Sequence, residues 1–599
     1  MKSILKKTFS RETKFFGQSH KFVFYVNKKF WLVFFFYKSL FSILLIKKID
    51  NPKLEISRNI SPSICNNYKK RKKNSCQEKY LFFFCSKGDN EVERKEKKTA
   101  IVPTREEDYP EWYQQVIKVS DLAENSDVRG CMVIKPYGYA LWENIQKHLD
   151  LKFKETGHKN AYFPLLVPKS FFEKEAEHVS GFAKECAVVT HSRLEDDGKG
   201  GLTVGGELTE PLIVRPTSET IIGASFARWV QSYRDLPLLI NQWANIVRWE
   251  MRTRMFLRTT EFLWQEGHTV HSTKEEAMEE TLKMLGVYAT FVREYLAIPV
   301  IEGEKTPGER FPGALNTYCI EAMMQDKKAL QAGTSHFLGQ NFSRAAGIKF
   351  QNKNGLEEFG WTTSWGVSTR LIGALIMAHS DDNGLIVPPR VAPIHIVFIP
   401  IFKSETDRIV VLNYIKQITI ALKKIRYHEE SLRVEVDERD LTSSEKNWYW
   451  IKKGVPIKVE IGMKDIEKDS LFIACRNKQP FEKESISQNF FLANISDILE
   501  GIQRSLYEKA FQLQKENSFK IDLQDDFYRF FQVPKQRKNE IPGGFAFSHW
   551  CGSELCEQKV KEELKVTIRC IPLEAEKEKG SCLFCGGNSE KRVIFAKAY

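Results

Sequence analysis

The sequence has few cysteines and, past its first hundred residues, no excess of charge. Only 12 Cys occur in 599 residues and no credible signal peptide precedes them, so a disulfide-stabilised scaffold is excluded. The net charge of +13 comes from residues 1–100, which hold 24 Lys and Arg against 8 Asp and Glu, whereas the other 499 residues hold 66 against 69. A histone-like protein, a disordered polyampholyte and a collagenous chain are therefore excluded.

Both common nucleotide-binding fingerprints are also absent from the sequence. There is no G-x-x-x-x-G-K-[ST] and no G-x-G-x-x-G following an expected strand. No internal repeat occurs at the periods of solenoid proteins. The length and the 42% hydrophobic content suffice for several buried cores, which indicates a large intracellular protein of about four units.

Residues 1–100 form an atypical leader rich in Lys and Phe. Its apolar run from Phe30 to Ile46, with Lys38 as its one charge, is marginal for a bilayer of about 30 Å. Lys outnumbers Arg 20 to 4, which is not typical of a transit peptide. Our hypothesis is that residues 1 to about 98 are disordered or not native, as a misplaced start would produce. A membrane anchor and a targeting segment are the alternatives, and we expect no membrane partner for the body of the chain.

Charge becomes balanced and amphipathic patterns begin near Thr104. The patterns indicate three units, at 101–390, 391–501 and 502–599. Among the elements that we expect in the first unit are strands over 238–250 and 261–269 and helices over 274–296 and 365–380. In the second unit we expect alternating strands and helices, which predicts an α/β domain with a mostly parallel sheet. Its strands are expected over 394–400, 432–436 and 457–461, and its helices over 407–424 and 443–453. The third opens with a helix over 502–516.

The densest group of chemically useful residues surrounds Arg248-Trp249-Glu250. Side chains alternate along a strand, so Arg248 and Glu250 are expected on one face. An arginine fork suits a phosphate, and a neighbouring carboxylate can accept the amine of adenine. Arg370, on the next apolar helix, supplies a second fixed cation. A pair of surface Arg–Glu bridges is the alternative for Arg-x-Glu taken alone.

Three ordered strings identify a family. They run over 156–164 (TGHKNAYFP), over 248–268 (RWE, FLRT and FLWQEGH) and over 364–370 (SWGVSTR). They closely resemble motifs 1, 2 and 3 of class II aminoacyl-tRNA synthetases, specifically prolyl-tRNA synthetases of the archaeal/eukaryote-like architecture. The resemblance covers residues 101–599, and no HIGH-type or KMSKS-type string of the class I enzymes is visible.

The resemblance implies a fold and a reaction. The fold is an α+β catalytic domain with a six- or seven-stranded antiparallel sheet and flanking helices, an α/β anticodon-binding domain, and a small C-terminal α/β zinc-binding domain. The reaction is the activation of L-proline by ATP with Mg²⁺ to prolyl-adenylate, followed by transfer to the 3′ end of tRNA(Pro). A homodimer is implied because motif 1 works at a subunit interface.

Site residues follow from the resemblance position by position. Those implied at ATP are Arg248, Glu250, Arg258, Thr259, Gln331, Thr334, Ser368 and Arg370. Those implied at proline are Thr217, Glu219, Arg248, Phe262, Trp264, Glu266, His268 and His336. Ser368 stands where many relatives have Thr, and both residues offer a hydroxyl. The residue types fit the substrate, since a secondary ammonium needs a carboxylate and a compact ring needs a small apolar slot.

The interval between His268 and Gln331 is too short for the editing insertion of the bacterial-type relatives. A hydrophobic slot rejects a smaller side chain by only about 1–3 kcal/mol per methylene. We therefore predict that alanine is mis-activated and is not cleared by this chain.

Four cysteines in the tail have the spacing of a zinc site. Cys551 and Cys556 form C-x4-C, and Cys582 and Cys585 form C-x2-C about thirty residues later. Four thiolates close a tetrahedral shell, so we expect a structural zinc ion. Buried or spare thiols are the alternative, and Cys570 is a rival ligand.

The anticodon-type unit offers three residues that could contact RNA, Arg439, Glu460 and Arg476, although a surface charge cluster would look the same. A catalytically silent paralogue and a sister enzyme for threonine, serine or glycine are the alternative functions. We expect a cytoplasmic location, with an organelle as the alternative if the leader is a targeting segment.

Overall fold

The computed structural model describes residues 21–27, 30–37, 40–47, 100–174, 185–480, 482–532 and 542–599. The chain divides into two compact units, Met1–Lys97 and Lys98–Tyr599. In the part of the chain that the structure describes, no helix is both long enough and apolar enough to cross a membrane.

The first unit contains a three-stranded antiparallel sheet. Its strands are β1 (Lys21–Asn27), β2 (Phe30–Tyr37) and β3 (Leu40–Lys47). The apolar run of the leader therefore lies in β2 and β3, and what we expect of the rest of the leader falls outside the described residues.

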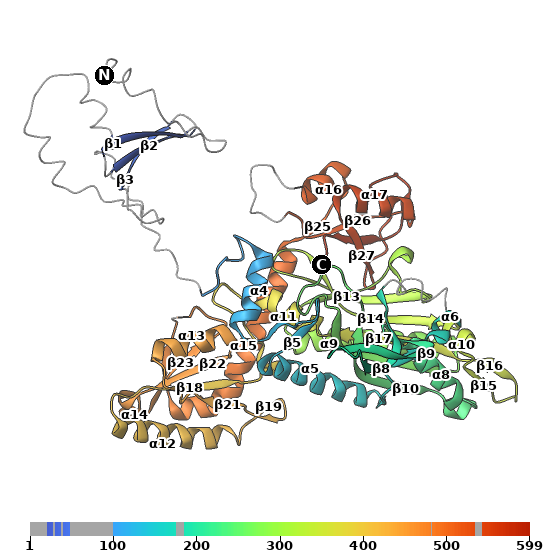
Figure 1. Ribbon diagram of the computed structural model, residues 1–599, viewed down its shortest axis with the longest axis horizontal. Helices are drawn as coiled ribbons and strands as arrows, with labels where there is room; N and C mark the ends of the chain where they lie inside the picture. Colours follow the sequence, from blue (N-terminus) through green and yellow to red (C-terminus); the bar gives the residue numbers. More distant parts are fainter. Residues whose placement is uncertain are drawn as a thin grey trace, which may run out of the picture. The chain divides into compact units, whose positions relative to one another are not determined.

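The second unit is built around an eleven-stranded sheet (Figure 1). Seven of its strands, in the order β12-β13-β14-β17-β11-β10-β6, form the antiparallel sheet that the resemblance implied, except that the short β6 runs parallel to β10. Their bounds are β6 (Lys159–Asn160), β10 (Leu238–Val247), β11 (Glu261–His271), β12 (Val300–Glu304), β13 (Asn316–Met323), β14 (Ala329–Gly339) and β17 (Trp361–Ser368).

The other four strands come from the C-terminal residues. They are β25 (Ser518–Lys520), β26 (Phe545–His549), β27 (Thr567–Pro572) and β30 (Arg592–Ala596). β27 pairs antiparallel with β12, so the C-terminal strands continue the catalytic sheet. An edge strand has unpaired backbone N–H and C=O groups, and β27 covers those of β12.

Helices cover the sheet and bury its apolar side chains in one large core. They are α4 (Tyr109–Val119), α5 (Pro136–Glu155), α9 (Lys274–Glu294) and α11 (Arg370–His379). α9 begins at a capping box, in which the hydroxyl of Thr273 accepts from the backbone N–H of Glu276 and the carboxylate of Glu276 accepts in return. Its buried face then packs on β14 and β17.

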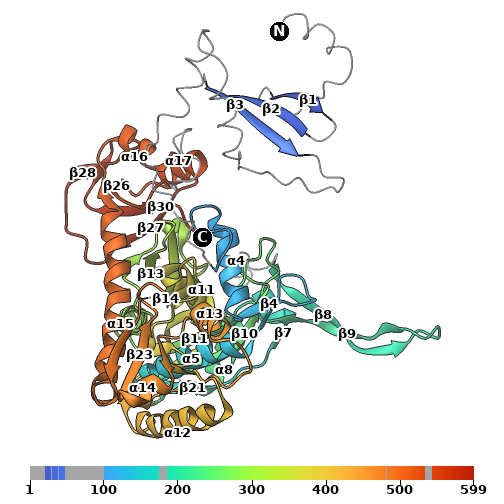
Figure 2. The same ribbon diagram turned by 90° about the vertical axis from the view of Figure 1, so that its left-hand side faces the viewer.

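A smaller sheet, in the order β7-β9-β8, adjoins helix α8. The elements are β7 (Leu166–Pro168), β8 (Ala187–Asp196), β9 (Leu202–Val214) and α8 (Glu219–Trp229). Figure 2 shows the β8–β9 hairpin projecting away from the rest of the unit. Arg215 follows β9 and is fully buried, donating to the carbonyl of Phe163 and to both oxygens of Asn245, which fixes the start of α8.

The α/β domain has a five-stranded sheet in the order β21-β18-β22-β23-β24. Its elements are β18 (Ile396–Pro400), α12 (Glu405–Leu422), β21 (Val434–Val436), α13 (Ser443–Lys453), β22 (Ile457–Ile461), β23 (Ser470–Cys475) and β24 (Glu484–Ser487). β18 is parallel to β21 and β22, but β23 pairs antiparallel with both its neighbours. The prediction of a mostly parallel sheet was therefore wrong for half of the pairings, because only the five-residue helix α14 (Met463–Glu467) follows β22 and no helix lies between β23 and β24 in the described part of the chain.

Three predicted boundaries were also wrong. The helix expected over 502–516 is the C-terminal half of α15 (Gln488–Glu516), whose first turns pack into the core of the α/β domain. The expected helix over 365–380 begins only at Arg370, since Trp365 to Ser368 pair with β11 in the sheet. β10 ends at Val247, so Arg248 and Glu250 lie in the loop after the strand and not on one face of it.

Candidate active site

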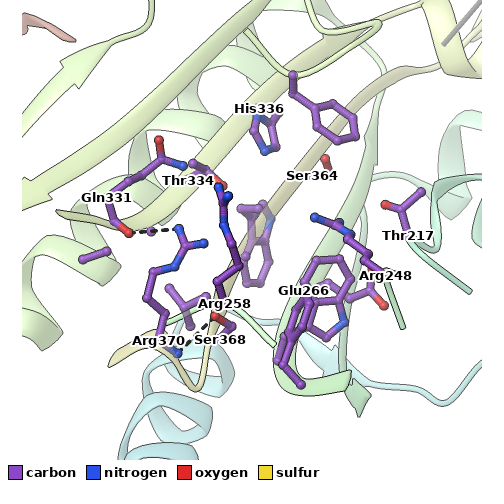
Figure 3. Close-up of a pocket in the computed structure, with 18 of the residues that line it drawn as sticks. Thr217, Arg248, Arg258, Glu266, Gln331, Thr334, His336, Ser364, Ser368 and Arg370 are labelled. Carbon is purple, nitrogen blue, oxygen red and sulfur yellow. Dashed lines mark hydrogen bonds between the residues drawn. The ribbon is translucent and has the colours of Figure 1, made fainter. Parts of the chain in front are cut away.

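The structure brings all fifteen residues implied at ATP and proline to the wall of one cavity of about 830 Å³. In Figure 3, Arg258, Arg370, Gln331 and Thr334 lie on one side, and Thr217, Arg248 and Glu266 lie on the other. One side is therefore basic and the other carries the carboxylates and aromatic rings.

Two strands present these side chains by different means. On β11, cavity residues alternate with buried ones, so Phe262, Trp264, Glu266 and His268 share one face. On β14, Gln331 and Thr334 are three positions apart, which would place them on opposite faces of a regular strand. The register shifts between β13 and β14 at this point, so that a bulge brings both side chains to the cavity.

Arg248 is the cation of the second side, and its charge reaches Arg370 on the first side. Its Nε donates to the carbonyl of Pro216 (2.9 Å), and its guanidinium lies 5.8 Å from the ring centres of both Phe262 and Trp264. Burial lowers the pKa of Arg248, although the carboxylates of Glu219, Glu185 and Glu266 oppose the shift. These contacts hold the guanidinium of Arg248 beside the aromatic rings and fix its orientation.

Arg258 and Glu250 face each other across the loop after β10. Nε of Arg258 lies 3.3 Å from Oε2 of Glu250, and the other carboxylate oxygen accepts from the backbone N–H of Arg252. The hydroxyl of Thr259 donates to the carbonyl of Glu261 (2.7 Å), which anchors the end of this loop. Arg258 keeps more than half of its side chain exposed, so it can turn toward a ligand.

Arg370 is a buried cation at the start of α11. It donates to the carbonyls of Leu257 (3.2 Å) and Gln331 (3.5 Å), and its backbone N–H donates to the hydroxyl of Ser368. Burial, together with the nearby guanidinium groups of Arg258 and Arg248, lowers the pKa of Arg370 to about 10. Such a cluster of cations favours the binding of an anion.

Glu266 is the best-connected carboxylate of the acidic side. It accepts from Ser218 (2.6 Å), Gln242 (2.7 Å) and Nε2 of His268 (3.0 Å). Burial acts to raise the pKa of Glu266, but these hydrogen bonds outweigh burial and the pKa is lowered. In the same way burial acts to lower the pKa of His268, and the contact with Glu266 raises it. The contact therefore favours the charged form of each side chain.

The other proline candidates complete that side of the cavity. The hydroxyl of Thr217 donates to the carboxylate of Glu219, which begins α8. His336 is held by Thr317 (3.1 Å), and its ring lies 4.7 Å from that of Phe311. Burial, together with the charge of His268, lowers the pKa of His336 to about 3, so this imidazole is neutral.

Sequence reasoning missed several residues of the wall, among them Glu185, Lys305, Arg310, Phe311 and Ser364. Ser364 begins the third family string but was given no role there, and the other four come from outside the three strings, where no spacing pattern marks them. Lys305 contacts one of the C-terminal strands. Its ammonium donates to Glu321 (2.8 Å) and to the carbonyl of Arg569 on β27 (2.7 Å). Arg569 in turn donates twice to Glu321.

The four predicted zinc ligands lie together. The Sγ atoms of Cys551, Cys556, Cys582 and Cys585 are all within 4.8 Å of one another, and two of the pairs are 3.5 and 3.7 Å apart. A tetrahedral Zn–S₄ centre with bonds of about 2.3 Å has sulfur atoms about 3.8 Å apart, so the thiols fit such an ion. Cys570 is not in the group; it is fully buried against Cys319, with which it interacts.

The three candidate RNA contacts are scattered through different environments. Arg439 donates twice to Asp437 and lies 3.8 Å above the ring of Tyr449, and Glu460 pairs with Lys483. Arg476 is buried and donates to both carboxylate oxygens of Asp381, in the catalytic domain. Its donors hold two domains together in this arrangement.

Family models match three parts of the chain. The model "tRNA synthetase class II core domain (G, H, P, S and T)" matches residues 203–379, and "Anticodon binding domain" matches residues 397–498. "Prolyl-tRNA synthetase, C-terminal" matches residues 537–599.

Whole proteins are similar over most of their length. The proline–tRNA ligase of Bdellovibrio bacteriovorus is 59% identical over 501 residues, which are 84% of this chain and 99% of the relative. That of Rhodopirellula baltica is 59% identical over 502 residues, 84% of this chain and 98% of the relative.

Solved structures share the fold. Prolyl-tRNA synthetase from Cryptosporidium parvum complexed with L-proline and AMP is 36% identical, with a TM-score of 0.73, and covers 83% of this chain and 97% of its own. The same enzyme complexed with halofuginone and AMPPNP is 37% identical with a TM-score of 0.74, at the same coverage.

Proposed function

This chain belongs to the family of proline–tRNA ligases, within the class II synthetases, and we propose that its cavity joins L-proline to ATP and then charges tRNA(Pro). The observation that carries the proposal is the position of Arg248. This guanidinium lies against Phe262 and Trp264, on the side with the carboxylates, and its charge also acts on Arg370 across the cavity. It is suited to bridge a carboxylate and a phosphate.

In the first step a carboxylate oxygen of proline attacks the α-phosphorus of ATP in line. The new P–O bond forms as the bond to the bridging oxygen of the β-phosphate breaks, and pyrophosphate leaves with the electron pair. Arg248 aligns the attacking carboxylate with the α-phosphate, while Arg258 and Arg370 neutralise the outer phosphates. Glu250 is the acceptor for the adenine amine. Gln331 and Thr334 are the residues that would hold magnesium brought with ATP, which would supply further charge neutralisation.

In the second step a hydroxyl of the terminal ribose of tRNA attacks the carbonyl of prolyl-adenylate, and AMP leaves. The proline must stay fixed through both steps. Its secondary ammonium has two N–H donors, and Glu219 and Glu266 offer carboxylate oxygens on that side of the cavity. Phe262 and Trp264 form the apolar wall for the ring.

The test is pyrophosphate exchange into ATP with purified full chain. We expect exchange that depends on proline and not on threonine, serine or glycine, and an Arg248→Lys variant that keeps the charge but loses the fork should be about 100-fold slower. A wild-type chain without proline-dependent exchange would reject the assignment.

Alanine tests the finer assignment to the archaeal/eukaryote-like architecture without an editing insertion. From His268 to Gln331 every residue is described, and the chain there forms only the end of β11, α9, β12, the short turn η3 (Pro307–Glu309), β13 and the start of β14. We therefore expect alanine-dependent exchange and persistent alanyl-tRNA. Rapid hydrolysis of alanyl-tRNA by the purified chain would contradict this.

The implied homodimer has one structural support. The motif 1 strand β6 forms an edge of the eleven-stranded sheet, so its outer backbone groups are not paired within the described part of the chain. Next to it, Tyr162 is 72% exposed. Light scattering should give twice the chain mass of 69.5 kDa, and a mass equal to that of one chain would exclude the dimer.

The cysteine cluster supports a structural zinc ion as resident cofactor, held by the four thiolates named above. All nine cysteines of the described residues are free thiols, which suits a cytoplasmic location, with an organelle as the alternative. Arg439 and Glu460 are proposed to contact RNA. Arg476 could contact RNA only if its hydrogen bonds to Asp381 broke.

A further inference from the structure

A second cavity of about 350 Å³, called here the side cavity, adjoins the catalytic one. The two cavities share four wall residues, Arg252, Leu257, Arg258 and Arg370. Six more residues line the side cavity alone, and they are Thr253, Arg254, Lys328, Leu330, Ala598 and Tyr599. A ligand could therefore pass from one cavity to the other while staying next to the same guanidinium groups.

The wall of the side cavity carries five cationic side chains and no acidic side chain, and its one carboxylate is the α-carboxylate of the last residue, Tyr599. Arg258 and Lys328 have acidic partners behind the wall, Glu250 and Asp326. Among the residues that the structure describes, the guanidinium groups of Arg252, Arg254 and Arg370 form no ion pair with an acidic side chain. These guanidinium groups are therefore suited to bind an anion.

The chain terminus makes this wall rigid. The backbone N–H of Tyr599 donates to the carbonyl of Ala329, and its hydroxyl donates to Asp326 (2.6 Å). The guanidinium of Arg254 and the ammonium of Lys328 then lie 5.7 and 4.9 Å from the centre of the Tyr599 ring. Two cations are thus held in fixed positions on one ring, close to the catalytic guanidinium groups.

We propose that the side cavity receives the inorganic pyrophosphate that leaves when the adenylate forms. This inference rests on the proposed function, since only that reaction releases a polyphosphate here. The leaving group departs on the side opposite the attacking carboxylate, toward Arg258 and Arg370. Because these two residues also line the side cavity, pyrophosphate can move onto Arg254 and Lys328 without losing charge-assisted contacts.

The two cations that line only the side cavity make the idea testable. Arg254 and Lys328 are absent from the wall of the catalytic cavity. Removing either charge should therefore weaken the binding of pyrophosphate and leave the binding of proline and ATP unchanged. Lys327 is a matched control, because it lies on the same β13–β14 turn but does not line the side cavity.

The experiment is a calorimetric titration of inorganic pyrophosphate into the full chain saturated with a sulfamoyl analogue of prolyl-adenylate. The analogue fills the catalytic cavity, and the heat of its own binding tests the proposed function separately. We expect one pyrophosphate per wild-type chain, bound about tenfold more weakly by Arg254→Gln and by Lys328→Gln, which corresponds to one lost charged contact. Lys327→Gln should bind as wild type does.

The wild-type titration decides the matter even if a variant fails to fold: analogue binding without pyrophosphate binding overturns the proposal. Equal weakening by Lys327→Gln would also overturn it, because a general loss of charge would then explain the effect. The KM for tRNA provides the last check. A raised KM for tRNA in Arg254→Gln and Lys328→Gln with unchanged pyrophosphate affinity would assign these cations to RNA phosphates instead.

Discussion

At the scale of single residues, the cavity contains titratable side chains whose neutral forms burial by itself would favour. Glu266 and His268 are both buried, and each favours the charged form of the other because they lie 3.0 Å apart. Breaking such a pair leaves an uncompensated buried charge, which is costly. The secondary ammonium of proline must therefore be recognised beside an ion pair that already exists in the protein.

The pH dependence of this pair can be predicted. The pKa of His268 is raised above its ordinary 6.5, so its charge stabilises the fold fully below that value and this contribution disappears as the pH rises through the raised pKa. The pKa of Glu266 is lowered, so its contribution is present above the ordinary 4.5 and disappears as the pH falls through the lowered value. In a histidine NMR titration the midpoint of His268 should lie above 6.5 and should fall in Glu266→Gln. An unchanged midpoint in the variant would contradict the pairing.

Gly267, between these two residues, is required by packing. A Cβ at this position would overlap the indole ring of Trp365, which is buried beneath the sheet. Gly267→Ala should lower the free energy of unfolding by about 3 kcal/mol, the cost of overpacking a core. Denaturant unfolding measures this change. The control is Gly501→Ala on the exposed face of α15, where a Cβ meets nothing within 4 Å and should stabilise by about 1 kcal/mol. Equal effects of the two changes would contradict the packing argument.

At the scale of elements, the pairing of β12 with β27 connects the C-terminal strands to the wall of the catalytic cavity. Glu321 on β13 is fully buried and binds both Lys305, which lines the catalytic cavity, and Arg569 on β27. Three charges from three segments thus satisfy one another in the interior.

Removing one charge of this triad should show how much the triad contributes to the free energy of unfolding. Arg569→Met leaves Glu321 with one cation in place of two, and we expect a loss of about 3 kcal/mol in the free energy of unfolding. Arg408→Met, on the surface pair with Glu405, should cost less than about 1 kcal/mol. Chemical denaturation of both variants checks the difference, and similar small losses would mean that the buried triad contributes little.

At the scale of the whole described body, Lys98–Tyr599, contacts far apart in the sequence join the domains. Arg476 of the α/β domain donates to Asp381 of the catalytic domain, and the hydroxyl of Tyr137 donates to the carbonyl of Lys453. The C-terminal residues close the catalytic sheet at one end and reach the side cavity at the other. A change in the cluster of four cysteines should therefore alter the structure of the active site.

Metal analysis of the full chain should find about one zinc ion per chain, and strong chelators or Cys551→Ser should remove it. Because that cluster lies in the segment that supplies β27, metal loss should lower the midpoint of thermal unfolding and reduce proline-dependent exchange together. Cys131→Ser, outside the cluster, is the control and should change neither. Zinc-free chain with an unchanged midpoint would show that the ion does not support the fold.

Local patterns were enough for some elements and residues and not for others. The helix over Ser443–Lys453 and the strand over Ile457–Ile461 follow from apolar periodicity and were predicted with these bounds. The cavity residues lie in strings that could be recognised, although Arg248 and Glu250 reach it from a loop. Lys305 and Phe311 could not be found, since only the folding of distant strands makes them part of the wall.

The sequence by itself determined the class of fold and the family, because period-two and period-3.6 patterns and a few ordered strings are local properties of a chain. Only the tertiary structure decided that the C-terminal strands extend the catalytic sheet, that a bulge aligns Gln331 with Thr334, and that Arg476 is buried between domains. Backbone hydrogen bonds between strands carry no sequence label, so which edges pair depends on how whole surfaces pack. That packing is settled only when all the elements are present together.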